Sequence, residues 1–179
     1  VTGEGISNID GLIGANGVNL FLLNPNGIVF GPQARLDIGG SFLATTAERF
    51  EFADGATFGQ TSTSPNLPLL TVTTPVGLQF GANPGQIEVR GSGHNFAPDR
   101  QTGQLQRSPA GGLQVESGQS LTLLSGDISL NGGNLTAEQG NIHLGSVGGN
   151  SQVRLDNLFQ PNYSGVENSG SIDLRQRAS

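Results

Sequence analysis

Residues 112–149 carry a short apolar segment about every seven residues, and most neighbouring segments are separated by a glycine. The apolar positions are Val115, Leu121, Leu123, Ile128, Leu130, Leu135, Ile142 and Leu144. Each segment is too short to form a core alone, and three segments give a period of about 20–25 residues, which is typical of repeat architectures. A hairpin meander would need longer strands and two-residue turns. The pattern therefore predicts a parallel β-solenoid with three short strands per coil and ladders of inward-facing apolar side chains.

The segment 18–45 follows the same scheme, with strands expected near residues 18–23, 28–30, 34–38 and 41–45. At about 22 residues per coil, and with an allowance for insertions, the chain would supply six or seven coils, with the polar alternate residues facing water. Two stretches do not fit. Residues 60–75 are expected to begin as a polar loop and end as a strand, and the polar residues 91–109 to form a hairpin or mobile excursion outside the coil.

Composition limits the function classes. The chain of 179 residues is long enough for one domain with its own core, and only 12% of its residues are charged against about 25% in typical domains. A net charge of -6 and a pI near 4.7 argue against nucleic acid and anionic membrane surfaces as partners. The lack of cysteine excludes disulfides, thiolate nucleophiles and cysteine metal sites. Because the sequence starts at Val1 and has no methionine, we expect a fragment or a processed chain that has lost an export signal.

The motif Asn24-Pro25-Asn26-Gly27-Ile28 lies between two of the expected strands. Proline pre-sets the backbone angle of an early turn position, and the following asparagine and glycine tolerate positive φ. The residues themselves therefore predict a tight turn. The side-chain amides of Asn24 and Asn26 can also hydrogen-bond backbone groups of adjacent coils and so lock that turn.

The remaining chemistry-bearing residues form no recognisable catalytic or metal motif. Neither histidine has a second ligand at metal spacing, and we expect His143 to face solvent and His94 to lie in the excursion. Parallel β-helices can also host polysaccharide lyases or hydrolases that use paired carboxylates and basic residues in a groove. The candidates for such a site are Asp37, Asp127, Glu138 and Asp156, with Arg35 or Arg154. Their wide spacing favours solvated surface charges, so we expect no catalytic residues, metal or cofactor.

The run from residue 8 to residue 47 resembles the secretion domain of the filamentous haemagglutinin family. The resemblance rests on residues 24–28, the pair Phe30-Gly31 and the segment GGSFLATTA at 39–47. The later segments 75–93 and 124–149 are similar to the cyanobacterial branch of the family, so the resemblance extends over nearly the whole chain. The family comprises exoproteins of bacterial two-partner secretion, among them adhesins, haemagglutinins, cytolysins and contact-dependent toxins.

The resemblance implies that residues 1–179 form a single right-handed parallel β-helix, the haemagglutination activity domain, at the amino end of a large exported protein. It implies as partner an outer-membrane β-barrel transporter with periplasmic recognition domains, and a location outside the cell or on its surface. Residues 24–28 would be a recognition or folding signal for secretion. The chain would open inside the family domain, without the first strands that cap the helix.

Two other functions remain open at this point. The domain can be a directly adhesive module, whose polar ladders and excursion contact glycans or proteins of a host or neighbouring cell. It can also be a β-helical polysaccharide lyase or hydrolase. Glycan binding by the isolated domain would favour the first of these functions, and release of sugars by the pure protein would favour the second.

Overall fold

All regular secondary structure in the described part of the chain is β-strand. The computed structural model describes residues 4–59, 74–108, 111–157 and 159–179, and these segments contain no helix. The prediction of an all-β fold is thereby confirmed. Within the same segments, no helix has the length and apolar character needed to cross a membrane. A loop and a strand were expected at residues 60–75, and residues 60–73 of them lie outside the described part of the chain.

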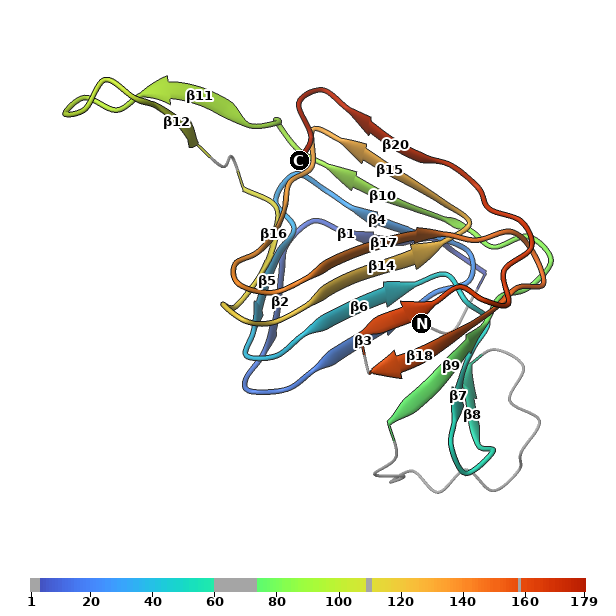
Figure 1. Ribbon diagram of the computed structural model, residues 1–179. Helices are drawn as coiled ribbons and strands as arrows, with labels where there is room; N and C mark the ends of the chain where they lie inside the picture. Colours follow the sequence, from blue (N-terminus) through green and yellow to red (C-terminus); the bar gives the residue numbers. More distant parts are fainter. Residues whose placement is uncertain (1–3, 60–73, 109–110, 158) are drawn as a thin grey trace.

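Three faces built from parallel strands surround the main core (Figure 1). Face one is a five-stranded sheet with the order β1 (Ser7–Ile9), β4 (Ile28–Phe30), β10 (Gln86–Arg90), β15 (Asp127–Asn131) and β20 (Ile172–Arg175). Face two consists of the pair β2 (Leu12–Ala15) and β5 (Arg35–Ile38) and the pair β13 (Leu113–Val115) and β16 (Leu135–Ala137). Face three has the order β3 (Leu20–Leu23), β6 (Phe42–Thr45), β14 (Leu121–Ser125) and β17 (Ile142–Ser146).

The chain visits faces one, two and three in the same order in four successive passes. The passes are β1–β2–β3, β4–β5–β6, β10–β13–β14 and β15–β16–β17, after which β20 returns to face one. The expected strands near 18–23, 28–30, 34–38 and 41–45 are confirmed as β3 to β6. The expectation of six or seven coils is wrong, because three long segments build structures outside the three faces instead of further coils. One segment follows the second pass, one lies within the third pass between β10 and β13, and one follows the fourth pass.

Inward-facing side chains stack in register through the passes. On face one, Ile28 pairs with Ile87, and Ile87 pairs with Ile128, and all three are buried. Each such side chain stabilises the fold by about 1.5–3 kcal/mol when it leaves water. Ile142 was predicted to be a core residue but is 43% exposed. It lies on β17, the outermost strand of face three, so only one neighbouring strand covers it.

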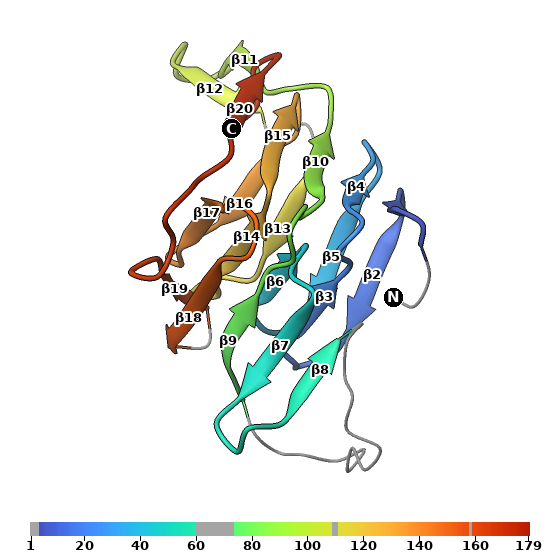
Figure 2. The ribbon, with the colours of Figure 1, turned by 90° about the vertical axis from the view of Figure 1, so that its right-hand side faces the viewer.

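An antiparallel sheet covers the outer side of face three and creates a second core (Figure 2). Its order is β19 (Gln160–Asn162), β18 (Gln152–Asn157), β9 (Pro75–Gln79), β7 (Arg49–Phe52) and β8 (Thr57–Gly59). The second core joins outward residues of face three to side chains of this sheet, and includes Leu23, Leu43, Leu124, Phe50, Leu78, Val153 and Phe159. The sheets of the protein are therefore mixed, parallel around the main core and antiparallel outside it.

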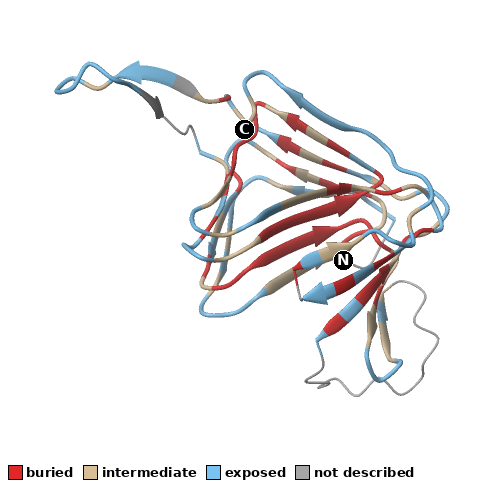
Figure 3. Cartoon of the chain, viewed as in Figure 1, coloured by how far each residue is buried: buried red, intermediate tan, exposed pale blue. Residues whose placement is uncertain are grey.

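The second core contradicts the expectation that the outward alternate residues face water. On face three, β6 and β14 are buried along their whole length (Figure 3). His143, expected to face solvent, is half-buried, and its Nε2 atom is shielded from water without a hydrogen-bond partner. The sequences of these strands, FLAT and LTLLS, contain no charged or amide side chains, as is typical of strands covered on both faces.

A hairpin projects from the three-sided body between β10 and β13 (Figure 1). Its strands β11 (Asn95–Pro98) and β12 (Leu105–Ser108) pair in antiparallel register and lie within the segment 91–109. Phe96 and Leu105 are exposed on it. The chain then re-enters face two through Gly111 and Gly112, both of which have positive φ.

Candidate functional site

The motif at residues 24–28 forms the corner between β3 and β4. The amide of Gly27 donates to the carbonyl of Asn24 at 3.2 Å, which closes a tight turn with Pro25 at its second position. The amide of Asn26 donates to Oδ1 of Asn24 at 3.1 Å. Gly27 has a φ of 127°, a conformation that side chains other than glycine rarely adopt. The turn predicted from these residues is present.

Asn24 links this corner to the pass before it and the pass after it. Its side chain is fully buried, and Nδ2 donates to the carbonyl of Gly5 at 3.0 Å and to Oγ of Ser7 at 2.8 Å. Its backbone amide donates to the carbonyl of Thr45 at 3.1 Å, in the next pass. A buried amide must find such partners, because an unpaired one costs about 1–3 kcal/mol. Asn24 therefore joins the start of the first pass to the end of the second pass at this corner.

The corners stack on one another, and glycine makes this possible. The amide of Gly85 donates to the carbonyl of Pro25 at 3.0 Å. The carbonyl of Gly85 in turn accepts hydrogen bonds from the amide of Gly126 at 3.0 Å and from Oγ1 of Thr46 at 2.9 Å. A Cβ atom at Gly85 would lie 2.6 Å from the carbonyl carbon of Asn26, so no other residue fits without moving the backbone.

Sequence reasoning missed the role of Gly85 and Thr46 in this corner. The signal that would have found the glycine is the tripeptide Asn83-Pro84-Gly85, which repeats the asparagine, proline and glycine of the motif one pass later. Thr46 belongs to the segment GGSFLATTA, and its side chain is fully buried. Two of the segments that carried the resemblance therefore meet at one place in the fold.

The five motif residues differ in what they present to a partner. Asn24, Gly27 and Ile28 are buried, and Ile28 belongs to the main core. Pro25 and Asn26 are partly exposed. A protein that contacted the folded motif would therefore touch Pro25 and Asn26.

The charged residues considered for a glycosidase or lyase site lie on separate surfaces. Arg35 and Asp37 lie on β5 of face two, whereas Arg154 and Asp156 lie on β18 of the outer sheet. The carboxylate of Asp127 accepts hydrogen bonds from the amide and hydroxyl groups of Ser171 at 2.7 and 2.9 Å, at the start of β15. Glu138 is exposed in the turn after β16. The fold thus brings together Arg35 and Asp37, which share one outer strand face, but not the four carboxylates.

The two histidines do not converge with other ligands. His94 follows β10 and packs edge to face on Phe96, with ring centroids 5.1 Å apart, and its Nδ1 atom is buried without a hydrogen-bond partner. His143 lies on β17. Across the described segments, no group of three or more histidine, cysteine, aspartate or glutamate side chains is arranged to hold a metal ion.

Comparison with known proteins gives one match. The model of the family described as the TPS secretion domain matches residues 1–178. Neither the curated proteins nor the solved structures include one that matches this chain.

Proposed function

Since the chain belongs to the TPS secretion domain family and is therefore the secretion domain of a two-partner secretion exoprotein, we propose that periplasmic domains of its outer-membrane β-barrel transporter recognise it. A cognate outer-membrane transporter is the general partner of this family, and export leads to the cell surface or the extracellular space. The proposal adds that the recognised element is the chain around residues 24–28. It also takes the exoprotein to be a filamentous-haemagglutinin-like adhesin that contacts glycans or proteins of other cells, which rests on the resemblance of residues 8–47.

The proposal includes a folding role for the same domain. Three parallel faces visited in a constant order support a right-handed β-helix, in which each completed pass leaves a hydrogen-bonding strand edge for the next. In this mechanism the chain crosses the outer membrane unfolded and coils outside the cell. Each new pass buries several apolar side chains at about 1.5–3 kcal/mol each, so that folding favours outward movement of the chain. A chain without cysteine carries no disulfide that would block this passage.

The observation that carries the proposal is the corner at residues 24–28, where one buried asparagine joins the first two passes. Asn24 and Ile28 are inaccessible in the folded domain, so they support a folding function. Pro25 and Asn26 are accessible and support a recognition function. The motif therefore serves both functions with different residues.

The test is secretion of the chain by its transporter in a Gram-negative host, together with unfolding of the purified variants in urea. Asn24→Ala is expected to lower both secretion and stability. Asn26→Ala is expected to lower secretion with a smaller loss of stability, because its side chain is partly exposed. Asn8→Ala is the matched control, since Asn8 is exposed on β1 next to the same corner, and both quantities should be unchanged. Full secretion of both motif variants at unchanged stability would contradict the proposal.

A further inference from the structure

The ladder of hydrogen bonds is interrupted on face two, between two consecutive passes. β5 pairs with β2, and β13 pairs with β16, but in the described part of the chain no ladder joins β5 to β13. Faces one and three run through the same two passes without interruption. The break lies where the chain re-enters the body after the β11–β12 hairpin. It opens the only one of the three faces that is not a single sheet among these residues.

The width of the break limits what can fill it. Cα atoms of β5 and β13 lie within 8 Å of each other. A strand inserted between them would require about 9.6 Å, which is twice the usual spacing of about 4.8 Å. In the described residues no ladder of hydrogen bonds joins the two edges, and the space between them is too narrow for an added strand. A single oxygen atom between the two edges can bridge them.

Both edges present backbone donors and acceptors to this space. The amide of Arg35 bonds to the carbonyl of Gly11 on the opposite side, so the alternate peptide groups of Leu36 and Ile38 face the break. The amide of Leu113 bonds to the carbonyl of Asn134 above it, so the peptide group of Gln114 faces the break from the other edge. A hydroxyl group suits such a site because it donates and accepts at once.

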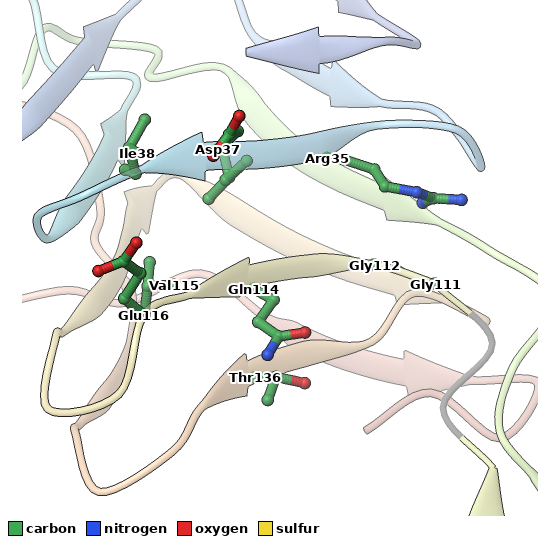
Figure 4. A pocket seen from close by; sticks show the side chains of 10 residues that line it. Arg35, Asp37, Ile38, Gly111, Gly112, Gln114, Val115, Glu116 and Thr136 are labelled. Carbon is green, nitrogen blue, oxygen red and sulfur yellow. The ribbon is translucent and has the colours of Figure 1, made fainter. Parts of the chain in front are cut away.

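A groove of about 400 Å³ lies over the break (Figure 4). Its polar side chains come from both edges and from β16: Arg35, Asp37, Gln114, Glu116 and Thr136. The volume is within the range of small-ligand pockets. The lining contains one guanidinium group and two carboxylates, and this negative balance disfavours anionic ligands.

Two details of the lining leave its polar groups available. Gln114 and Thr136 are paired in register on β13 and β16, and their side chains lie next to each other on the outer surface (Figure 4). At the other end, Gly111 leaves room for the guanidinium group, because a Cβ there would lie 2.9 Å from Nη1 of Arg35. A ligand over the break therefore meets a guanidinium group, an amide and a hydroxyl as well as the two strand edges.

We propose that this groove binds a short segment of a neutral oligosaccharide, with sugar hydroxyls bridging the peptide groups of β5 and β13. The narrow space between β5 and β13 disfavours an extended peptide, and the carboxylates of Asp37 and Glu116 disfavour acidic sugars. The site lies on face two, away from the corner at residues 24–28, and it does not depend on the proposed secretion role.

The experiment is a titration of the ¹⁵N-labelled full chain, followed by amide chemical shifts, with cellotriose, maltotriose, chitotriose and mannotriose as probes. Saturable shifts are expected at the amides of Leu36, Ile38 and Gln114 with at least one trisaccharide. Gln114→Ala should weaken that binding about tenfold, as expected for loss of one or two hydrogen bonds. Gln152→Ala is the matched control, because Gln152 is also an exposed strand glutamine but lies on β18 of the outer sheet. The spectra themselves report whether each variant is folded.

Two further probes separate the alternatives. Sialyllactose tests for an acidic sugar, and an uncharged hexapeptide of alternating threonine and valine tests for an added strand. Shifts at these amides with either of those probes alone would overturn the proposal. The absence of saturable shifts with all four neutral trisaccharides would overturn it as well, and would show that water fills the break. Equal affinity of Gln114→Ala and the unsubstituted chain would exclude the groove as the binding site.

Discussion

Replacement of Asn24 by alanine tests whether one buried amide stabilises the corner between the first two passes. The substitution removes three side-chain hydrogen bonds, to the carbonyl of Gly5, to Oγ of Ser7 and from the amide of Asn26. The backbone hydrogen bond of residue 24 to Thr45 in the second pass is kept. The change is therefore confined to the side-chain contribution.

The loss of stability depends on whether the three groups that lose their hydrogen bond to Asn24 can bond to water instead. Gly5 is exposed, and Ser7 and Asn26 are partly exposed, so water can replace the lost amide at each of them. The loss then stays near the net value of about 1 kcal/mol per hydrogen bond, not the full cost of an unsatisfied buried group. Asn24→Ala is expected to lower the free energy of unfolding by about 3 kcal/mol. Domains of this kind have about 5–15 kcal/mol in total, so the fraction is large.

The assay is equilibrium unfolding in urea, with Asn8→Ala as the exposed control. With a slope of about 2 kcal/mol per molar urea, the midpoint of Asn24→Ala should fall by about 1.5 M. The control should change the free energy of unfolding by less than about 0.5 kcal/mol. If the two midpoints agree within error, the contacts of Asn24 do not stabilise the corner and the reasoning is refuted.

Three further predictions concern the second core, the stacked corner and the single tyrosine. Leu124→Ala should lower the free energy of unfolding by about 3 kcal/mol, because Leu124 is fully buried under the antiparallel sheet; a loss below about 0.5 kcal/mol in urea would show that this sheet does not cover face three. Gly85→Ala should lower the free energy of unfolding by about 2 kcal/mol or more, since its Cβ would lie 2.6 Å from backbone atoms of Asn26. The control Gly11→Ala should be nearly neutral, because a Cβ there has open space, and equal melting temperatures of the two variants would contradict this prediction. Burial raises the pKa of Tyr163 to about 12 from an ordinary value near 10. The folded state thus favours the neutral phenol, and the stability it contributes below pH 10 is lost as the pH rises toward 12. Tyr163→Phe should abolish that loss in urea unfolding at pH 9 and 11.5, and an absorbance titration with a midpoint near 10 would contradict the raised pKa.

The strands were predictable where their local pattern matches their role. In β4 and β10, inward isoleucine and valine or phenylalanine side chains alternate with outward residues, and a glycine precedes each strand. A strand that stacks on strands with the same inward and outward pattern needs this alternation. The strand can therefore be recognised from a short segment of sequence. The turn at residues 24–28 was equally local, because proline, asparagine and glycine have strong backbone preferences.

The outer sheet was not predictable in the same way, because its strands come from distant parts of the chain. Glu51 on β7 accepts a hydrogen bond from Gln152, 101 residues later. Nothing near either residue specifies that pairing. The sequence LTLLS of β14 is apolar on both sides, which indicated that both sides are covered. The expected solenoid nevertheless placed the outward residues of every strand in water.

The candidate site was only half predictable for a related reason. The stacking of Gly85 on the motif at residues 24–28 depends on which pass follows which. The residues between Thr46 and Gly85 include β7, β8 and β9, which separate neighbours in space by a long stretch of sequence. The number of passes was overestimated for the same reason, since such insertions occupy more of the chain than the expectation allowed.

The antiparallel sheet also changes how the whole stack should come apart. A stack of repeats in which each repeat contacts only its neighbours behaves as a one-dimensional array and unfolds from its ends. Here β9 is bonded to β7, which leaves the second pass, and to β18, which leaves the fourth. Loss of the last pass would strip Val153 and Phe159 from a cluster that includes Leu43 of the second pass. The antiparallel sheet thus couples the fourth pass to the second. We therefore expect one sharp melting transition and not gradual unfolding from the ends.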